Sequence, residues 1–209
     1  MTKKEKEELL KTVLSHEFSR CTNSFNLFAN LMATLPKQDT KKRRVDCYNA
    51  YVDFVSHLYE FYKGLIVRDA KFKQTGVYKD YPSFKGLTKN DEHKKFDIIF
   101  NEEVEKLIRH RKQSIKRGNS DNLAGNRIDY YDFKVPQVFG EHFRFIRNRT
   151  SHTDYKRASG QHDISLKDFF LNYHKFILIL YDACRGGWQV DENTFDLKDI
   201  DNFASEILK

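Results

Sequence analysis

The chain of 209 residues is 39% hydrophobic and 14% aromatic, which suits one domain with a sizeable core and argues against two well-packed domains. Its three widely spaced cysteines argue against a disulfide framework, and its charged amino terminus and short aliphatic runs argue against a secretion signal or a membrane span, so we expect a cytoplasmic protein. The net charge of +7 favours a polyanionic partner without excluding others.

The first half of the chain predicts two long amphipathic helices. Apolar residues at alternating spacings of three and four run through residues 14–35, and Pro36 ends this first helix. A second stripe of the same kind runs through residues 48–65. Residues 69–90 contain glycines and a proline, and we interpret them as an ordered loop, with a short hairpin at 73–81 as the alternative.

The third predicted helix begins near Asn90 or Asp91, where a cap and acidic side chains suit the positive end of the helix dipole. Gly118 is expected to end it. The polar stretch 119–134 predicts a loop, and Pro136 favours the start of a fourth helix. The residues on the apolar side of this fourth helix are Phe139, Phe143 and Ile146.

A fifth helix is expected from about Ser165, and Gly186 and Gly187 are expected to end it. It is apolar nearly all round, which predicts the most central position in the fold. The apolar residues within 189–209 suffice for one short docking helix. This last segment also carries six acidic residues against two lysines, a net charge of −4 that leaves +11 for the preceding residues.

Together these elements predict an all-α fold. Antiparallel helices with short connections bury such stripes most simply. We therefore expect a helical bundle of about five long helices with ordered loops and a short C-terminal helix. No repeat or linker interrupts the pattern, so we expect one domain over residues 1–209, with 189–209 as an acidic C-terminal appendage.

Common phosphate- and metal-binding signatures do not occur in the sequence. It has no G-x-x-x-x-G-K, no G-x-G-x-x-G, no H-E-x-x-H, no Cys/His zinc spacing and no nucleophile elbow. Glu102, Glu103 and Glu105 lack a Glu-x-x-His partner and are expected to form a solvated face. We therefore expect no metal and no cofactor.

Residues 147–152, RNRTSH, concentrate polar chemistry at the end of the fourth predicted helix. An arginine followed directly by asparagine and five places later by histidine is expected roughly 0.03 times by composition. His152 suits proton transfer near neutral pH, and the forked, permanently charged guanidinium of Arg147 suits stabilisation of a phosphate in metal-free RNA cleavage. Asn148 is expected to fix the arginine or a phosphate through its amide.

The pattern R-N-x-x-x-H at the end of an apolar-striped helix, within a small all-α chain, resembles the HEPN superfamily of ribonucleases and RNA-binding helical bundles. The pattern covers six residues and is supported by a compatible helical layout over residues 9–185. The resemblance implies a metal-independent endoribonuclease of the toxin–antitoxin, abortive-infection or antiviral defence type, with Arg147 and His152 in the catalytic positions and Asn148 beside the arginine. It also implies RNA as substrate, a homodimer, and an antitoxin or regulatory protein as a further partner.

On an uninterrupted helix, five residues advance about 7.5 Å and turn about 140°, so Arg147 and His152 of one chain do not converge on one phosphate. Either the helix breaks near Thr150 and Ser151, or two chains share the site. We favour a twofold dimer with the site in a cleft between the chains.

Other basic and aromatic residues are candidates for holding RNA. Those near the motif are Arg144, Arg149, Lys156 and Arg157. The acid-free run 109–117 also suits phosphates, although cations at the end of a helix are favoured by its dipole in any case. The candidates for stacking on bases are Tyr130, Tyr131 and Tyr155.

The alternative function is a noncatalytic HEPN-like helical module that binds RNA or a protein partner through its basic surface. In a purely structural interpretation, Arg147 pairs with Glu141 or another carboxylate, Asn148 satisfies a helix end, and His152 lies at the surface near a helix dipole. A more distant alternative is a transferase or hydrolase whose histidine serves another substrate.

Overall fold

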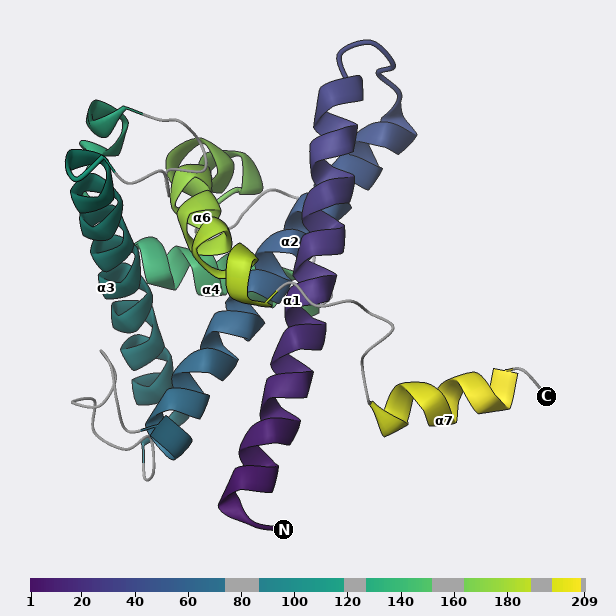
Figure 1. Cartoon of the computed structure of the whole chain (residues 1–209). Helices are drawn as coiled ribbons and strands as arrows, with labels where there is room; N and C mark the ends of the chain where they lie inside the picture. Colours follow the sequence, from purple (N-terminus) through teal and green to yellow (C-terminus); the bar gives the residue numbers. More distant parts are fainter. Residues whose placement is uncertain (74–86, 119–126, 152–163, 189–196, 208–209) are drawn as a thin grey trace. The chain divides into compact units, whose positions relative to one another are not determined.

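The computed structural model describes residues 1–73, 87–118, 127–151, 164–188 and 197–207. These residues form six α-helices and two short helical turns, and they contain no β-strand (Figure 1). The predicted all-α fold, with five long helices and a short one at the carboxyl end, is confirmed. The chain divides into two compact units, residues 1–83 with 188–209 and residues 84–187, and the expectation of a single domain stays a prediction.

Two long helices, α1 (Lys3–Thr34) and α2 (Lys41–Arg68), lie side by side in the first unit (Figure 1). Aromatic rings join them along their length, with centroids 4.7 to 5.0 Å apart. The pairs are Phe18–Phe61, Phe25–Phe54 and Phe28–Tyr51. Their order reverses between the two helices, so α1 and α2 are antiparallel, and the predicted stripes face each other.

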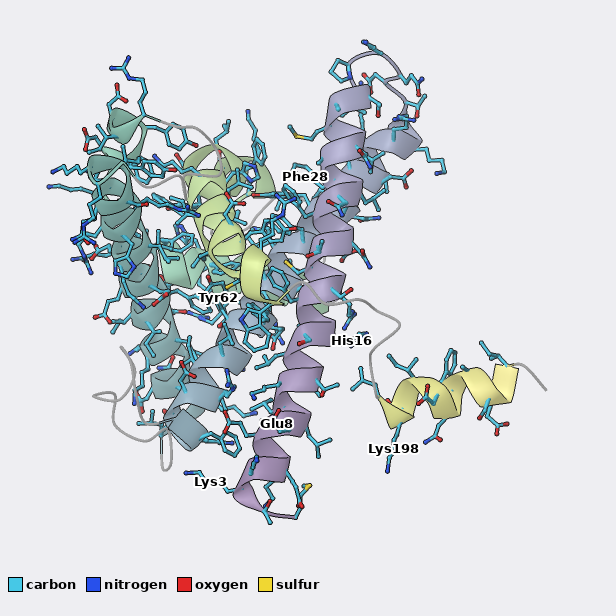
Figure 2. All side chains as sticks on the ribbon, in the orientation of Figure 1. Lys3, Glu8, His16, Phe28, Tyr62 and Lys198 are labelled. Atoms are coloured by element: carbon cyan, nitrogen blue, oxygen red, sulfur yellow. The ribbon has the colours of Figure 1, made fainter. Side chains whose placement is uncertain are left out.

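The start of α1 lies well before its apolar stripe because a capping box nucleates it. Thr2 Oγ1 accepts a hydrogen bond from the Glu5 amide at 3.2 Å, and the Thr2 amide donates to Glu5 Oε2 at 2.7 Å. Lys3, Glu8 and His16 follow along this polar first half of the helix (Figure 2). At the other end the helix stops just before Pro36, as predicted, but Met32 of the stripe is 45% exposed rather than buried.

Beyond α2 the chain stays helical for one more turn. Asp69–Lys73 form a π-helical turn, η1, where the sequence predicted a loop. That prediction is wrong for these five residues because the Asp69 amide donates to the carbonyls of Leu65 and Ile66 and so continues the helical ladder. The alternative hairpin falls, apart from Lys73, outside the described residues.

Four elements make up most of the second unit: α3 (Lys89–Lys116), η2 (Ile128–Tyr131), α4 (Phe139–Ser151) and α6 (Leu166–Trp188), whose last residue falls in the first unit. Thr88 caps α3, accepting from the Asp91 amide at 3.2 Å, so this helix begins slightly before the predicted position. Gly118 follows the end of α3 with φ of 69°, the left-handed conformation that ends many helices, which confirms its predicted role.

The core of the second unit is aromatic and surrounds α4. Phe143 of α4 meets Phe100 of α3 with ring centroids 5.1 Å apart, and Phe139 meets Phe176 of α6 at 5.3 Å. All four of these rings are almost fully buried, as is Ile146. The predicted apolar side of α4 is therefore confirmed, and it packs against both α3 and α6.

α6 does not end where its glycines suggested. Ser165 caps its start, as predicted, by accepting from the Asp168 amide at 2.9 Å. The helix then continues through Gly186 and Gly187 to Trp188, which corrects the predicted end. Glycine ends a helix by adopting a positive φ, and neither of these two does so. Leu171 is 67% exposed, so one side of α6 also faces solvent.

α7 (Lys198–Ile207) is the short helix predicted at the carboxyl end. Its apolar side chains Ile200, Phe203 and Ile207 are 44%, 67% and 67% exposed, and the docking expected of this helix stays a prediction. Within the described ranges, no helix combines the length and the apolar character that crossing a bilayer requires.

Replacing Phe61 with alanine is expected to destabilise the protein by about 3–5 kcal/mol, because Phe61 is fully buried against Phe18 and its loss leaves a cavity. Tyr48→Ala on the same helix, where the side chain is 38% exposed, is the matched control and is expected to cost about 1 kcal/mol or less. Urea unfolding followed by circular dichroism measures both. Equal losses would contradict the α1–α2 packing.

Candidate functional site

Two of the three predicted catalytic residues lie together near the carboxyl end of α4. Arg147 and Asn148 are both half-buried, and Arg147 Nη1 donates a hydrogen bond to Asn148 Oδ1 at 3.0 Å. α4 continues without a break through Thr150 to Ser151. His152, the third predicted residue, lies outside the described part of the chain.

The hydrogen bond to Asn148 restricts how the Arg147 side chain can turn. A guanidinium is planar and carries its donors in a fixed fork, so a bond to one nitrogen orients the whole group. Fixing the arginine is one of the two roles expected of Asn148. The contact joins neighbouring residues of one helix, so it needs no partner from another element.

One turn before Arg147, the side chain of Arg144 is bound to Asp97 of α3. Arg144 Nε lies 3.0 Å from Asp97 Oδ1, and its Nη2 lies 2.8 Å from Oδ2, which is a bidentate ion pair. Glu141 adds a longer contact of 3.6 Å to the same Nη2. The side chains of Asp97 and Arg144 are only 11% and 14% exposed. This pair fastens α4 to α3.

The predicted role of Arg144 in binding RNA stays a prediction, but its guanidinium already has a structural partner. An RNA phosphate would have to compete with the buried Asp97 carboxylate for the same donors. Arg149 lies half-buried in the last turn of α4. The other two predicted contacts, Lys156 and Arg157, lie outside the described residues.

The start of α4 is held by the same region of α3. A Cβ on Gly140 would lie 2.1 Å from the Asp97 carbonyl oxygen, so only glycine allows the backbones to approach this closely. Asn101 Oδ1 accepts from the Gly140 amide at 2.8 Å, and Asn101 Nδ2 donates to the Gln137 carbonyl at 2.5 Å. Asn101 thus satisfies an amide that the first turn of α4 leaves without a helical partner.

Reasoning from the sequence missed these three supporting residues. Asp97 carried a signal, because it lies one turn before Phe100 and two turns before Val104, a position where the apolar stripe of α3 holds a carboxylate. Gly140 carried another, because a glycine inside a predicted helix often marks a close approach of two backbones. Asn101 carried none, since its partners lie in a different segment of the chain.

Two other histidines of the second unit have local partners. His142 Nδ1 lies 2.9 Å from Tyr173 Oη, and the His174 ring stacks on Phe170 with centroids 4.6 Å apart. Burial lowers the pKa of His174 from 6.5 to about 4, so its imidazole is neutral at pH 7. His174 is therefore poorly suited to proton transfer near neutral pH.

The three tyrosines predicted to stack on bases differ in exposure. Tyr131 is only 3% exposed, which corrects its prediction, because a buried ring presents no face to a base. Tyr130 is 48% exposed, and Tyr155 lies outside the described residues. Within the part of the chain that the structure describes, no three His, Cys, Asp or Glu side chains gather in a way that would hold a metal ion.

Comparisons with protein-family models, with curated proteins and with solved structures find no match to this chain. The chemistry of the chain's own residues, above all at the carboxyl end of α4, is what indicates a function.

Asp97→Asn is expected to destabilise the protein by about 2–4 kcal/mol, because it leaves the largely buried Arg144 guanidinium with only the longer contact to the exposed Glu141 carboxylate. Asp39→Asn is the matched control. Asp39 also forms a bidentate pair, with Arg44, but that pair is exposed, and no measurable change is expected. Urea unfolding of both variants tests the difference, and equal stability of the two would show that the Asp97 pair does not fasten α4.

The stability of the protein is expected to fall as the pH decreases from about 6.5 to about 4, in part because of His174. Over this window the unfolded chain binds a proton at His174 that the folded chain does not bind, so acid favours unfolding. His174→Leu is expected to flatten this part of the profile, and His110→Leu, at an exposed position of α3, is not. Unfolding free energies between pH 4 and 7.5 provide the measurement; identical profiles for the two variants would contradict the lowered pKa.

Proposed function

We propose that the protein is a metal-independent endoribonuclease in which Arg147 stabilises the charge on the scissile phosphate and His152 transfers a proton. The observation that carries this proposal is the hydrogen bond between Arg147 and Asn148, which orients a guanidinium five residues before a histidine. The resemblance of R-N-x-x-x-H to the HEPN pattern supports it.

The chemistry requires few groups. The 2′-oxygen of the ribose forms a bond to phosphorus while the bond from phosphorus to the 5′-oxygen breaks, which leaves a cyclic phosphate and a 5′-hydroxyl. One proton leaves the 2′-hydroxyl and one reaches the departing 5′-oxygen, and an imidazole of ordinary pKa serves either transfer. The negative charge that develops on the phosphoryl oxygens is stabilised by the guanidinium of Arg147.

A homodimer belongs to the proposal. α4 is helical from Arg147 to Ser151, and the proposal takes the helical spacing to hold up to His152. A helix would place two side chains five residues apart about 140° from each other. Arg147 of one copy and His152 of a second copy, related by a twofold axis, form the proposed site.

The supports of α4 suit such a role. A group that stabilises a transition state must be held in place before the reaction begins. The Asp97–Arg144 ion pair and the Asn101 hydrogen bonds fasten α4 on the side of α3, and the helix carries Arg147 one turn further on. Because these contacts hold α4 in place, they support precise placement of the Arg147 guanidinium.

Purified protein is expected to cleave labelled single-stranded RNA or tRNA in EDTA and to leave cyclic phosphate ends. Arg147→Ala and His152→Ala are each expected to lose about 100-fold or more of this activity. Arg20→Ala, an exposed arginine of α1, and His93→Ala in α3 are matched controls expected to keep it. Undiminished cleavage by rigorously purified His152→Ala protein would reject the proposal. RNA binding without cleavage in the unaltered protein would favour the noncatalytic module instead.

Mixing the two inactive variants tests the shared site. A heterodimer of Arg147→Ala and His152→Ala chains contains one site with both residues intact, so the mixture is expected to recover about a quarter of the original activity. If each site draws both residues from one chain, the mixture stays inactive and the shared dimer site is rejected.

A further inference from the structure

The carboxyl half of α3 carries a basic face next to η2. Arg109, Lys112 and Lys116 recur at spacings of three and four residues, so they lie along one side of the helix. Lys112 forms an ion pair with Asp132, which directly follows η2, and this contact places that side of α3 beside η2. Arg109 and Lys116, in the turns on either side of Lys112, are exposed.

Not all cations of the run 109–117 belong to this face. Arg111 is half-buried and faces Asp182 of α6, where burial raises the pKa of the carboxyl and the charges of Arg111 and Arg185 partly offset the rise. Arg111 therefore contributes to the interior of the unit. Arg109 forms an exposed ion pair of 3.8 Å with Glu105, and such a pair contributes little to stability in water.

η2 adds an aromatic ring to the edge of this face. Tyr131 is buried, whereas its neighbour Tyr130 is 48% exposed and lies two residues before Asp132. The Tyr130 ring meets Tyr131 at 5.2 Å and Phe133 at 6.4 Å, with ring planes at 86° and 84°. These are edge-to-face contacts, which hold the Tyr130 ring in position. They differ from the parallel stacking that a base would form with this ring.

We propose that Arg109 and Lys116 of α3 together with Tyr130 of η2 form a binding surface for single-stranded RNA, here called the α3–η2 surface, with Lys112 holding η2 beside α3 through its ion pair with Asp132. The cations attract successive phosphates, and a base stacks on Tyr130. Cations alone would serve a duplex as well as a single strand, but an aromatic ring stacks only on a base that is unpaired. The helix dipole accounts for cations in the last turn of α3, but not for Arg109 two turns earlier or for the exposed ring.

This inference rests on the proposed function, because it takes RNA as the ligand. It adds the place on the protein where the RNA strand is bound. Lys112 lies about 22 Å along α3 from Asp97, which marks the crossing with α4. A strand of several nucleotides spans such a distance. The α3–η2 surface therefore holds RNA away from the proposed cleavage site.

The test measures binding of a labelled single-stranded RNA by fluorescence anisotropy over a range of salt concentrations, with all variants made in the His152→Ala protein so that the RNA stays intact. Arg109→Gln with Lys116→Gln is expected to weaken binding and to reduce the slope of log K against log salt by about 1.4. The matched control is Lys3→Gln with Lys4→Gln, two exposed lysines at the start of α1, which are expected to leave affinity and slope unchanged.

Tyr130→Ala is expected to weaken binding of single-stranded RNA roughly tenfold without changing the salt slope, because it removes stacking and no charge. Tyr130→Phe keeps the ring and is expected to bind within about twofold of the parent. Tyr48→Ala, another partly exposed tyrosine, is the matched control and is expected to bind like the parent.

Three outcomes would overturn the α3–η2 surface: no binding of RNA by the parent at low salt, variants that bind like their controls, or equal binding of duplex RNA with no effect of Tyr130→Ala. Failure of the α3–η2 surface and failure of the proposed nuclease function give different results. Cleavage that depends on His152 while the surface variants bind normally rejects the surface alone. Binding that depends on the surface in a protein that cuts no RNA rejects the nuclease and keeps the surface.

Discussion

The arrangement of the second unit depends on how Asp97 meets α4. Its backbone carbonyl occupies the space that a side chain at position 140 would need, and its carboxylate grips Arg144. A buried carboxylate is costly unless it is paired and hydrogen-bonded, so the bidentate guanidinium is required for this crossing to form. One residue thus sets both the separation of α3 and α4 and the rotation of α4. The direction in which Arg147 leaves the helix follows from that rotation.

The basic residues of the second unit divide by their partners rather than by their place in the sequence. Arg144 and Arg111 both belong to basic segments, yet each faces a carboxylate inside the unit. Arg109 and Lys116 face solvent. Net charge therefore overstates how many cations are available to a polyanion, and an exposed cation beside an exposed ring is a better indication of a nucleic-acid surface than a run of arginines and lysines.

The proposed function assigns separate tasks to separate parts of one unit. The end of α4 supplies an oriented guanidinium for chemistry, while the α3–η2 surface supplies charge and stacking for the strand. Both are carried by α3, because its first half fastens α4 and its second half fastens η2 through Lys112 and Asp132. Such a division lets binding and cleavage be altered independently, since the contacts that support them share no residue.

The sequence alone determined most of the helical elements, although not the turn Asp69–Lys73 or the end of α6, because the spacing of apolar side chains and the conformational limits of proline are local properties. The stripe of α4, the stop before Pro36 and the terminator Gly118 followed from it, whereas the hydrogen bond from Arg147 to Asn148 was only one of two roles expected of this asparagine. The tertiary structure decided which polar side chains meet across helices, such as Asp97 with Arg144, and which of Tyr130 and Tyr131 is exposed. These contacts join residues far apart along the chain, and their pairing depends on helix rotation and separation, which no local pattern encodes.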